Sequence, residues 1–185
     1  MGKTQYYTAT TLDGYIADKN NSLDWLFQVD RETGESSQYD TFFAGVGAMA
    51  MGATTYQWVL DHEHLLDDPA KWQAWYGGTP TWVFTHRSLP AVPGADIQFV
   101  QGDVAPVHAT MRAASSDRNI WLVGGGDLVG QFADKGLLNE IIVSVAPVTL
   151  GGGAPLLPRR IVGRMTLVRV ERDRQFANLT YSVEP

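Results

Sequence analysis

The segment from Asn119 to Phe132 restricts the fold of this chain more than any other, because three consecutive glycines stand between two apolar stretches. The apolar run Ile120–Val123 predicts a buried strand, and Asp127–Phe132 has the pattern of an amphipathic helix. Between them Gly124–Gly126 leave the backbone bare, so a ligand can approach it closely. The following helix would present unpaired N–H groups and the positive end of its dipole to an anion. The segment therefore predicts a site for a phosphate-bearing cofactor.

This glycine segment differs from the fingerprint of Rossmann folds. The GxGxxG pattern requires a glycine at the position that Val129 occupies. The segment thus predicts a dinucleotide site of another kind.

The order of the other patterned segments predicts an α/β fold. Strand patterns lie at residues 6–10, 46–51, 80–86, 97–100, 120–123 and 140–148. Helix patterns lie between them at residues 38–44, 52–60, 104–114 and 127–135. Residues 165–171 and 176–183 alternate in polarity and predict a C-terminal antiparallel hairpin. We expect a mostly parallel sheet flanked by helices, with loops at residues 18–21, 30–37 and 149–155 and a loop or irregular helix at 61–76.

Length and charge exclude several classes of protein. A chain of 185 residues without an evident linker predicts one domain, 1–185. The net charge of −6 argues against a general binder of nucleic acid or of an anionic membrane. The chain has no cysteine, and we expect no metal site, because His62–His64 lies in an acidic surface segment. Without a signal peptide or a membrane-length apolar run, a cytoplasmic location is expected.

Four groups of short motifs appear in the order found in a known family. They are Thr8–Ala17 (TATTLDGYIA), Ala50–Tyr56 (AMGATTY), Trp82–Arg87 (WVFTHR), and Leu122–Gly126 (LVGGG) with Leu137–Val143 and Leu150–Leu156. Together they resemble the dihydrofolate reductase-like superfamily. The resemblance is closest to the C-terminal reductase domain of the bacterial riboflavin-biosynthesis deaminase–reductases (the RibD C-terminal domain) and its free-standing relatives. It covers nearly the whole chain and implies a three-layer dihydrofolate reductase-like fold.

The resemblance also implies a cofactor, NADPH, lying extended across the carboxyl edge of the sheet. Next to the nicotinamide it places Ala9 and Ile16. At the phosphate-binding helix it places Gly52, Thr54 and Thr55, and at the adenosine end Thr85, His86 and Arg87. Around the pyrophosphate it places Val123, Gly124, Gly125, Gly126, Asp127, Leu128 and Val129, with a cis peptide bond between Gly124 and Gly125.

The resemblance leaves the catalytic residues open. We consider Asp13, in the turn after the first strand, although an aspartate there usually caps its own turn. Trp25 matches the family's active-site tryptophan, and Asp30 has the spacing of the carboxylate used by folate-reducing members. About seven extra residues before Met51 keep Glu35 and Asp40 open as well. Ala53 replaces an arginine that usually binds the 2′-phosphate, so His86 or Arg87 compensates or the preference for NADPH is weakened.

The activity implied is that of an NADPH-dependent reductase, an oxidoreductase acting on CH–OH or CH–NH groups. Hydride would pass to a C=N or C=O bond of a small heterocycle or ribosyl-pyrimidine, as in 5-amino-6-(5-phosphoribosylamino)uracil reduction in riboflavin biosynthesis. Two alternatives stay open: dihydrofolate reductase activity, and a nucleotide-binding module without turnover. The apolar strand at 141–148 and the terminal hairpin also predict a homodimer.

Overall fold

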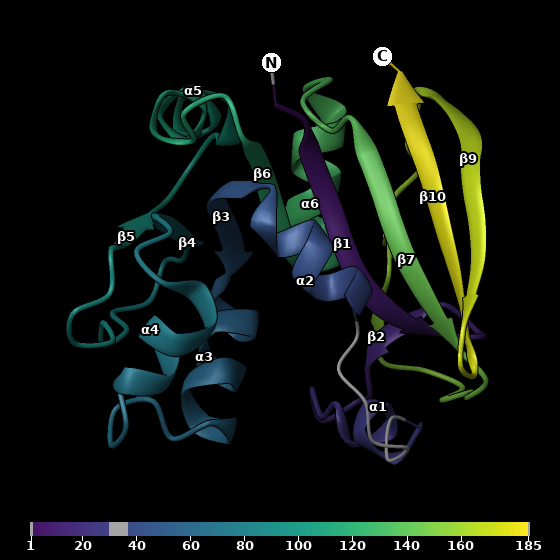
Figure 1. The fold of residues 1–185 in the computed structure, drawn as a ribbon, viewed down its shortest axis with the longest axis horizontal. Helices are drawn as coiled ribbons and strands as arrows, with labels where there is room; N and C mark the ends of the chain where they lie inside the picture. The colour runs from purple at the N-terminus through teal and green to yellow at the C-terminus, as the bar shows by residue number, and fades with distance from the viewer. Residues whose placement is uncertain (1, 30–36, 185) are drawn as a thin grey trace.

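The computed structural model describes residues 2–29 and 37–184 and shows an α/β fold built on one large sheet (Figure 1). Its eight strands lie in the order β5-β4-β3-β6-β1-β7-β10-β9. They are β1 (Thr4–Thr11), β3 (Val46–Gly52), β4 (Thr81–Phe84), β5 (Ile97–Val100), β6 (Asn119–Gly124), β7 (Glu140–Ala146), β9 (Arg164–Asp173) and β10 (Phe176–Glu184). All neighbouring pairs from β5 to β7 are parallel, whereas β10 is antiparallel to both β7 and β9. The predicted mixed, mostly parallel sheet with a C-terminal hairpin is confirmed.

Helices cover both faces of the sheet (Figure 1). The helices are α1 (Asp24–Val29), α2 (Ser37–Ala44), α3 (Ala53–His62), α4 (Ala70–Tyr76), α5 (Val104–Ala114) and α6 (Gly126–Asp134). Side chains alternate between the faces along each strand. Tyr6, Ala50 and Leu122 therefore pack with α5 and α6, and their neighbours Met51 and Trp121 pack with α2, α3 and α4. The result is a three-layer fold with one apolar core on each side of the sheet.

The carboxyl ends of the parallel strands meet at one edge of the sheet. The register pairs Met51 of β3 with Gly124 of β6, and β1 lies between β6 and β7. The chain leaves this edge in two short connections, into α3 after Gly52 and into α6 after Gly125. Open α/β sheets bind ligands at this edge, because the connecting loops leave a crevice there.

Two short helices and a small sheet lie in segments for which we expected a loop, an irregular helix or no regular element. The segment around Trp25 forms α1, and the segment around Trp72 forms α4, where Trp72 is buried in the core. The strands β2 (Tyr15–Ala17) and β8 (Ala154–Pro155) pair with each other in a second sheet. These elements are short and have little periodicity of their own, so tertiary contacts decide them. No helix within the described residues is long and apolar enough to span a membrane.

Candidate active site

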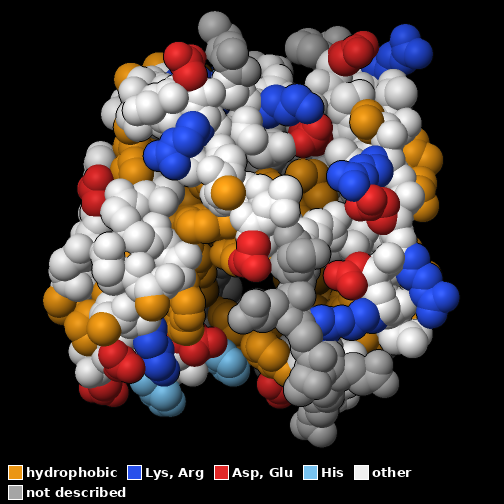
Figure 2. Space-filling view, viewed as in Figure 1, with side chains coloured by type: hydrophobic (Ala, Val, Ile, Leu, Met, Phe, Trp, Pro, Cys, Tyr) orange, Lys and Arg blue, Asp and Glu red, His pale blue; other side chains and the backbone are white. Residues whose placement is uncertain are grey.

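A cleft of about 2020 Å³ opens at the carboxyl edge of the sheet and continues over the face covered by α2 and α4. Figure 2 shows a hollow near the middle of this side of the molecule, with hydrophobic side chains along part of its border. Residues from the ends of β1, β3, β4 and β6 contribute to its wall, among them Ala9, Gly52, Phe84 and Gly124. The cleft is large enough for a dinucleotide together with a second small molecule.

Two helices begin at this cleft within one short stretch of its wall. The N-cap residues of α3 and α6 are Gly52 and Gly125, and neither helix start is capped by a side chain. The two turns are close, because a Cβ atom placed on Gly52 would lie 3.8 Å from the Gly124 carbonyl oxygen and from the Gly125 nitrogen. A Cβ atom on Gly125 would meet nothing within 4 Å. Two helix N-termini with bare backbone thus face one open space, which is an arrangement that attracts phosphate.

The predicted cofactor residues are mostly in the wall of this cleft. Those that line it are Ala9, Ile16, Gly52, Thr54, Thr55, Thr85, His86, Val123, Gly124, Gly125, Gly126, Asp127 and Leu128. The cis peptide bond expected between Gly124 and Gly125 is confirmed. Val129 instead lies fully buried in the core against the sheet, with only its N–H donating to the Gly125 carbonyl oxygen at 3.2 Å. The exposed Arg87 adjoins the cleft without lining it.

Aromatic side chains form another part of the cleft wall. Trp121 makes ring contacts with Tyr39 and Phe43 of α2 and with Tyr76 of α4, and all four line the cleft. Burial raises the pKa of Tyr76 to about 12 and also raises that of Tyr39, so both hydroxyls stay protonated at neutral pH. This region therefore offers flat apolar surfaces with neutral hydroxyl groups to a ligand.

A second aromatic group joins α1 to α3 at the cleft. The His62 ring stacks on Trp58, with ring centroids 4.4 Å apart, and on Phe27, with centroids 5.1 Å apart. Phe27 and Trp58 line the cleft. The sequence analysis placed His62 in an acidic surface segment, and the structure adds the aromatic stack as its local role. The sequence around His62 does not predict its contact with α1, because α1 is distant along the chain.

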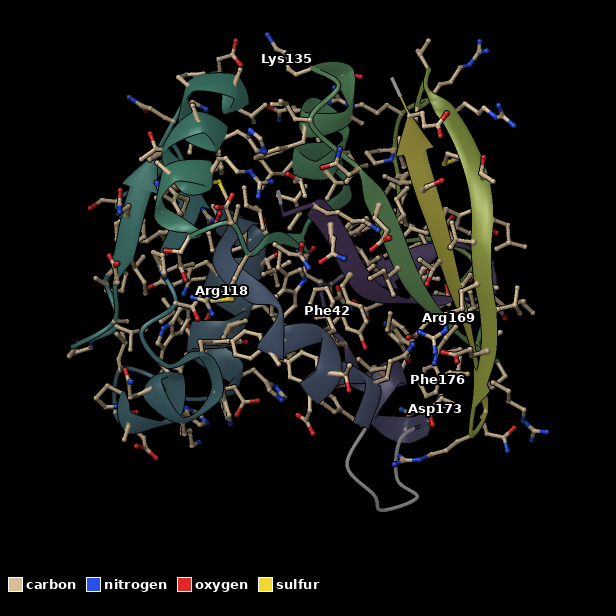
Figure 3. The ribbon with its side chains drawn as sticks, turned by 45° about the horizontal axis from the view of Figure 1, so that its top comes forward. Phe42, Arg118, Lys135, Arg169, Asp173 and Phe176 are labelled. Atoms are coloured by element: carbon tan, nitrogen blue, oxygen red, sulfur yellow. The ribbon has the colours of Figure 1, made fainter. Side chains whose placement is uncertain are left out.

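The charged side chains that line the cleft are mostly acidic. Among the described residues they are Asp40, Glu63 and Asp127 on the acidic side and Arg118 on the basic side. Arg118 precedes β6, whereas the glycine turn follows that strand, so the two lie at opposite ends of β6. Figure 3 also shows Arg118 well apart from Arg169 of the hairpin. Among the residues that the structure describes, no lysine or arginine side chain lines the cleft beside the two glycine turns. The helix N-termini are therefore the principal positive groups there.

Asp13 holds a loop and is not among the residues that line the cleft. Its carboxylate accepts hydrogen bonds from the Thr11 hydroxyl at 2.6 Å and from the Gly151 backbone N–H at 2.7 Å. These hydrogen bonds lower the pKa of Asp13, that from Thr11 most, and keep it ionised. The 150–153 turn is thereby tied to the end of β1. This turn also passes so close to β2 that a Cβ atom on Gly153 would lie 2.1 Å from the Ala17 carbonyl oxygen.

The other two predicted catalytic residues have different positions. Trp25 is buried in α1 at 5% exposure, and its indole N–H has no hydrogen-bond partner among the described atoms. Its neighbours Leu23, Leu26 and Phe27 line the cleft, but Trp25 itself does not. Asp30 lies outside the described residues, as does Glu35. Asp40, a further carboxylate left open by the sequence, lies within the described residues and lines the cleft.

Comparison with known proteins identifies relatives over almost the whole chain. The family model of the RibD C-terminal domain matches residues 3–176. The "Uncharacterized protein YwjB" of Bacillus subtilis (strain 168) is 28% identical over 180 residues, which cover 94% of this chain and 92% of that protein.

Solved structures show the same fold. The "Putative riboflavin biosynthesis protein" from Shewanella sp. PV-4 superposes with a TM-score of 0.79 at 24% identity, covering 99% of each chain. A "pyrimidine reductase-like protein" from Corynebacterium diphtheriae superposes with a TM-score of 0.64 at 12% identity, covering 100% of this chain and 92% of the other. The sheet order, the glycine turns and the match of the family model agree, and the chain belongs to the RibD C-terminal domain family.

Proposed function

We propose that this protein is an NADPH-dependent reductase that transfers hydride to a small heterocyclic or ribosyl-pyrimidine substrate. The observation that carries the proposal is the meeting of two uncapped helix N-termini, at Gly52 and Gly125, beside an aromatic cleft. The first feature suits the phosphates of a dinucleotide, and the second suits two flat rings placed face to face. Family membership supports the same class, since a relative of this fold is named a pyrimidine reductase-like protein.

The residues at the turns fit a dinucleotide. Gly125 has open space where a side chain would stand, and the Thr55 hydroxyl would lie 3.5 Å from a Cβ atom on Gly124. Both Thr54 and Thr55 lie in the first turn of α3, so their hydroxyls and N–H groups are available to phosphate oxygens. We assign these residues to the phosphates, Ala9 and Ile16 to the nicotinamide, and Thr85 and His86 to the adenosine end. NADPH supplies the hydride from C4 of its nicotinamide ring when it is bound.

The aromatic part of the cleft is assigned to the substrate. Rings of Tyr39, Phe43 and Trp121 present surface for stacking, and they exclude water from the place where hydride would be transferred. Asp40, exposed on the first turn of α2, is the carboxylate that we propose to bind or protonate the heterocycle. Because a carboxylate at this place can also hold a pterin ring, dihydrofolate is the second candidate substrate.

Two measurements test this function. NADPH at a hundred times its dissociation constant should stabilise the fold by about 2.7 kcal/mol, which a thermal melt detects as a raised Tm. Oxidation of NADPH, followed at 340 nm, is then screened against 5-amino-6-(ribosylamino)pyrimidinones with and without a 5′-phosphate, and against dihydrofolate. Turnover of a pyrimidinone supports the proposal, and turnover of dihydrofolate alone selects the second candidate. A chain whose Tm is unchanged by millimolar NADPH and NADH is not a dinucleotide-dependent enzyme.

We also propose that the single domain 1–185 works as a homodimer. The edge strand β9 exposes Met165, Leu167, Val168 and Val170 by 49–61% each, and it has one free edge (Figure 1). An exposed apolar edge strand favours pairing with another chain. Sedimentation at micromolar concentration should give about twice the chain mass of 20.3 kDa. A monomer at that concentration contradicts the dimer, and the cytoplasmic location stays a prediction.

A further inference from the structure

An acidic side chain stands where the proposed function needs an anion to bind. Asp127 is in the first turn of α6, directly after the glycine turn, and it lines the cleft. A carboxylate at a helix N-terminus is attracted by the same partial positive charge that attracts phosphate. It therefore stabilises the empty protein and repels a phosphate that binds beside it.

Arg159 lies against this aspartate from outside the helix. One guanidinium nitrogen, Nη2, bonds Asp127 Oδ1, and the other, Nη1, donates to Asp134 Oδ2 at 2.6 Å. The Gln131 side-chain amide donates to the second Asp127 oxygen at 3.0 Å. These bonds, that from Arg159 most, lower the pKa of Asp127, so the carboxylate stays ionised and paired at neutral pH.

The path of Arg159 depends on a glycine inside the helix. A Cβ atom on Gly130 would lie 2.4 Å from Arg159 Cδ and 2.6 Å from Nε, so any larger residue would displace the arginine. A glycine in a helix interior destabilises the helix relative to alanine. A Rossmann fingerprint would have its third glycine at position 129, where this chain has Val129. The glycine at the next position, Gly130, is explained by the arginine side chain that crosses it. The helix surface is thus shaped to hold one guanidinium between Asp127 and Asp134.

We propose that Arg159 is a positioning residue that sets the affinity for the dinucleotide by neutralising Asp127 beside the phosphate site. The inference rests on the proposed function. Arg159 itself is not in the cleft wall, and it acts by holding the carboxylate and by cancelling its charge. Within the described residues, no lysine or arginine lines this part of the cleft, so the Asp127 carboxylate has no second cationic partner there.

The test is a double-mutant cycle on NADPH binding, measured by titration at low salt with Arg159→Met, Asp127→Asn and the double variant. Methionine keeps the unbranched stem over Gly130 and removes the charge. Arg159→Met should weaken binding roughly three- to tenfold, because it leaves an unpaired carboxylate beside the phosphates. Asp127→Asn should tighten binding about two- to fivefold, and the double variant should return to within about twofold of the wild type.

The matched control is Lys135→Met. Lys135 follows the other end of α6, pairs with Asp103 at 2.8 Å and is labelled far from the centre of the molecule in Figure 3. This variant loses the same single positive charge from an ion pair of α6, and its NADPH affinity should stay within about twofold of the wild type. At 0.5 M KCl, where the Debye length is only about 4 Å, the differences among the Asp127 and Arg159 variants should shrink.

The outcomes separate the inference from the proposed function. A wild type that binds neither NADPH nor NADH refutes both. If the wild type binds and Arg159→Met is unchanged, or if the double variant stays as weak as Arg159→Met, Arg159 does not act through Asp127. Asp127→Asn is a test that does not depend on how well the arginine variant folds, and unchanged or weaker binding by it also overturns the inference.

Discussion

Gly126→Ala is expected to loosen the start of α6 from the loop that supports it. Gly126 is buried, and an added Cβ atom would lie 2.4 Å from the Leu156 carbonyl oxygen and 2.7 Å from that of Pro155. Ordinary contact begins at 3.4 Å, so the loop or the helix must move by about 1 Å. Leu156 in turn donates its N–H to the Gly14 carbonyl oxygen at 2.9 Å, so the displacement reaches the turn after β1.

The size of the effect is the balance of two opposite contributions. Forcing a methyl group into a packed site typically costs about 1 to 3 kcal/mol. Replacing glycine by alanine in a helix returns up to about 1 kcal/mol. The net loss in the free energy of unfolding should be up to about 2 kcal/mol. NADPH binding should weaken as well, because the turn that faces the cleft moves.

The assay is urea unfolding, followed by tryptophan fluorescence, with NADPH titration of each variant. Gly78→Ala is the control: Gly78 also lines the cleft, but its added Cβ atom would meet nothing within 4 Å. Its stability should change by less than about 0.5 kcal/mol. If Gly126→Ala is as stable as this control and binds NADPH equally well, the close contact with residues 155 and 156 does not support the phosphate turn.

Three other predictions address the cofactor, the substrate and pH. If Arg87 or His86 contacts the 2′-phosphate, its replacement by alanine should weaken NADPH binding about ten- to a hundredfold and leave NADH binding unchanged. Equal wild-type affinities for the two cofactors would show that the 2′-phosphate site was lost with the arginine that Ala53 replaces. Asp40→Asn should lower kcat at least about tenfold while the dissociation constant of NADPH stays the same, and unchanged steady-state rates would exclude Asp40 as the acid. Burial, and secondarily the Arg112 guanidinium, lower the pKa of His108, so the contribution of His108 to stability is complete above about pH 6.5 and is lost as the pH falls. Between pH 7.5 and 5.5 the urea midpoint should therefore fall less in His108→Gln than in the wild type, and an equal fall in both proteins would contradict this.

Periodicity predicted the parallel part of the sheet and its long helices. Runs such as Ile120–Val123 are apolar on both faces, because both faces of a parallel strand are covered by helices. The segments that were not predicted as regular structure, α1 and α4, have six and seven residues. Helices of that length are not stable alone, and tertiary contacts hold them, such as that of Trp72 in α4 with Tyr56 of α3.

The glycine turn could be predicted as a cofactor site because its requirement is local. A bare backbone followed by a helix start is encoded within a few consecutive residues, so Gly124–Gly126 could be identified without the fold. The candidate catalytic carboxylates could not be distinguished by a local pattern of this kind. Asp13, Asp30, Glu35 and Asp40 are all plausible on spacing, and only the fold shows that Asp13 holds the 150–153 turn while Asp40 lines the cleft.

By itself, the sequence determined the mostly parallel α/β sheet, the terminal hairpin and the position of the glycine turn, since these follow from local patterns and from their order along the chain. Only the tertiary structure decided the strand order, the aromatic wall around Trp121 and the pairing of Arg159 with Asp127 across Gly130. These features join residues that are far apart along the chain. Their energies depend on distances that exist only after the layers have packed, and no local periodicity encodes those distances.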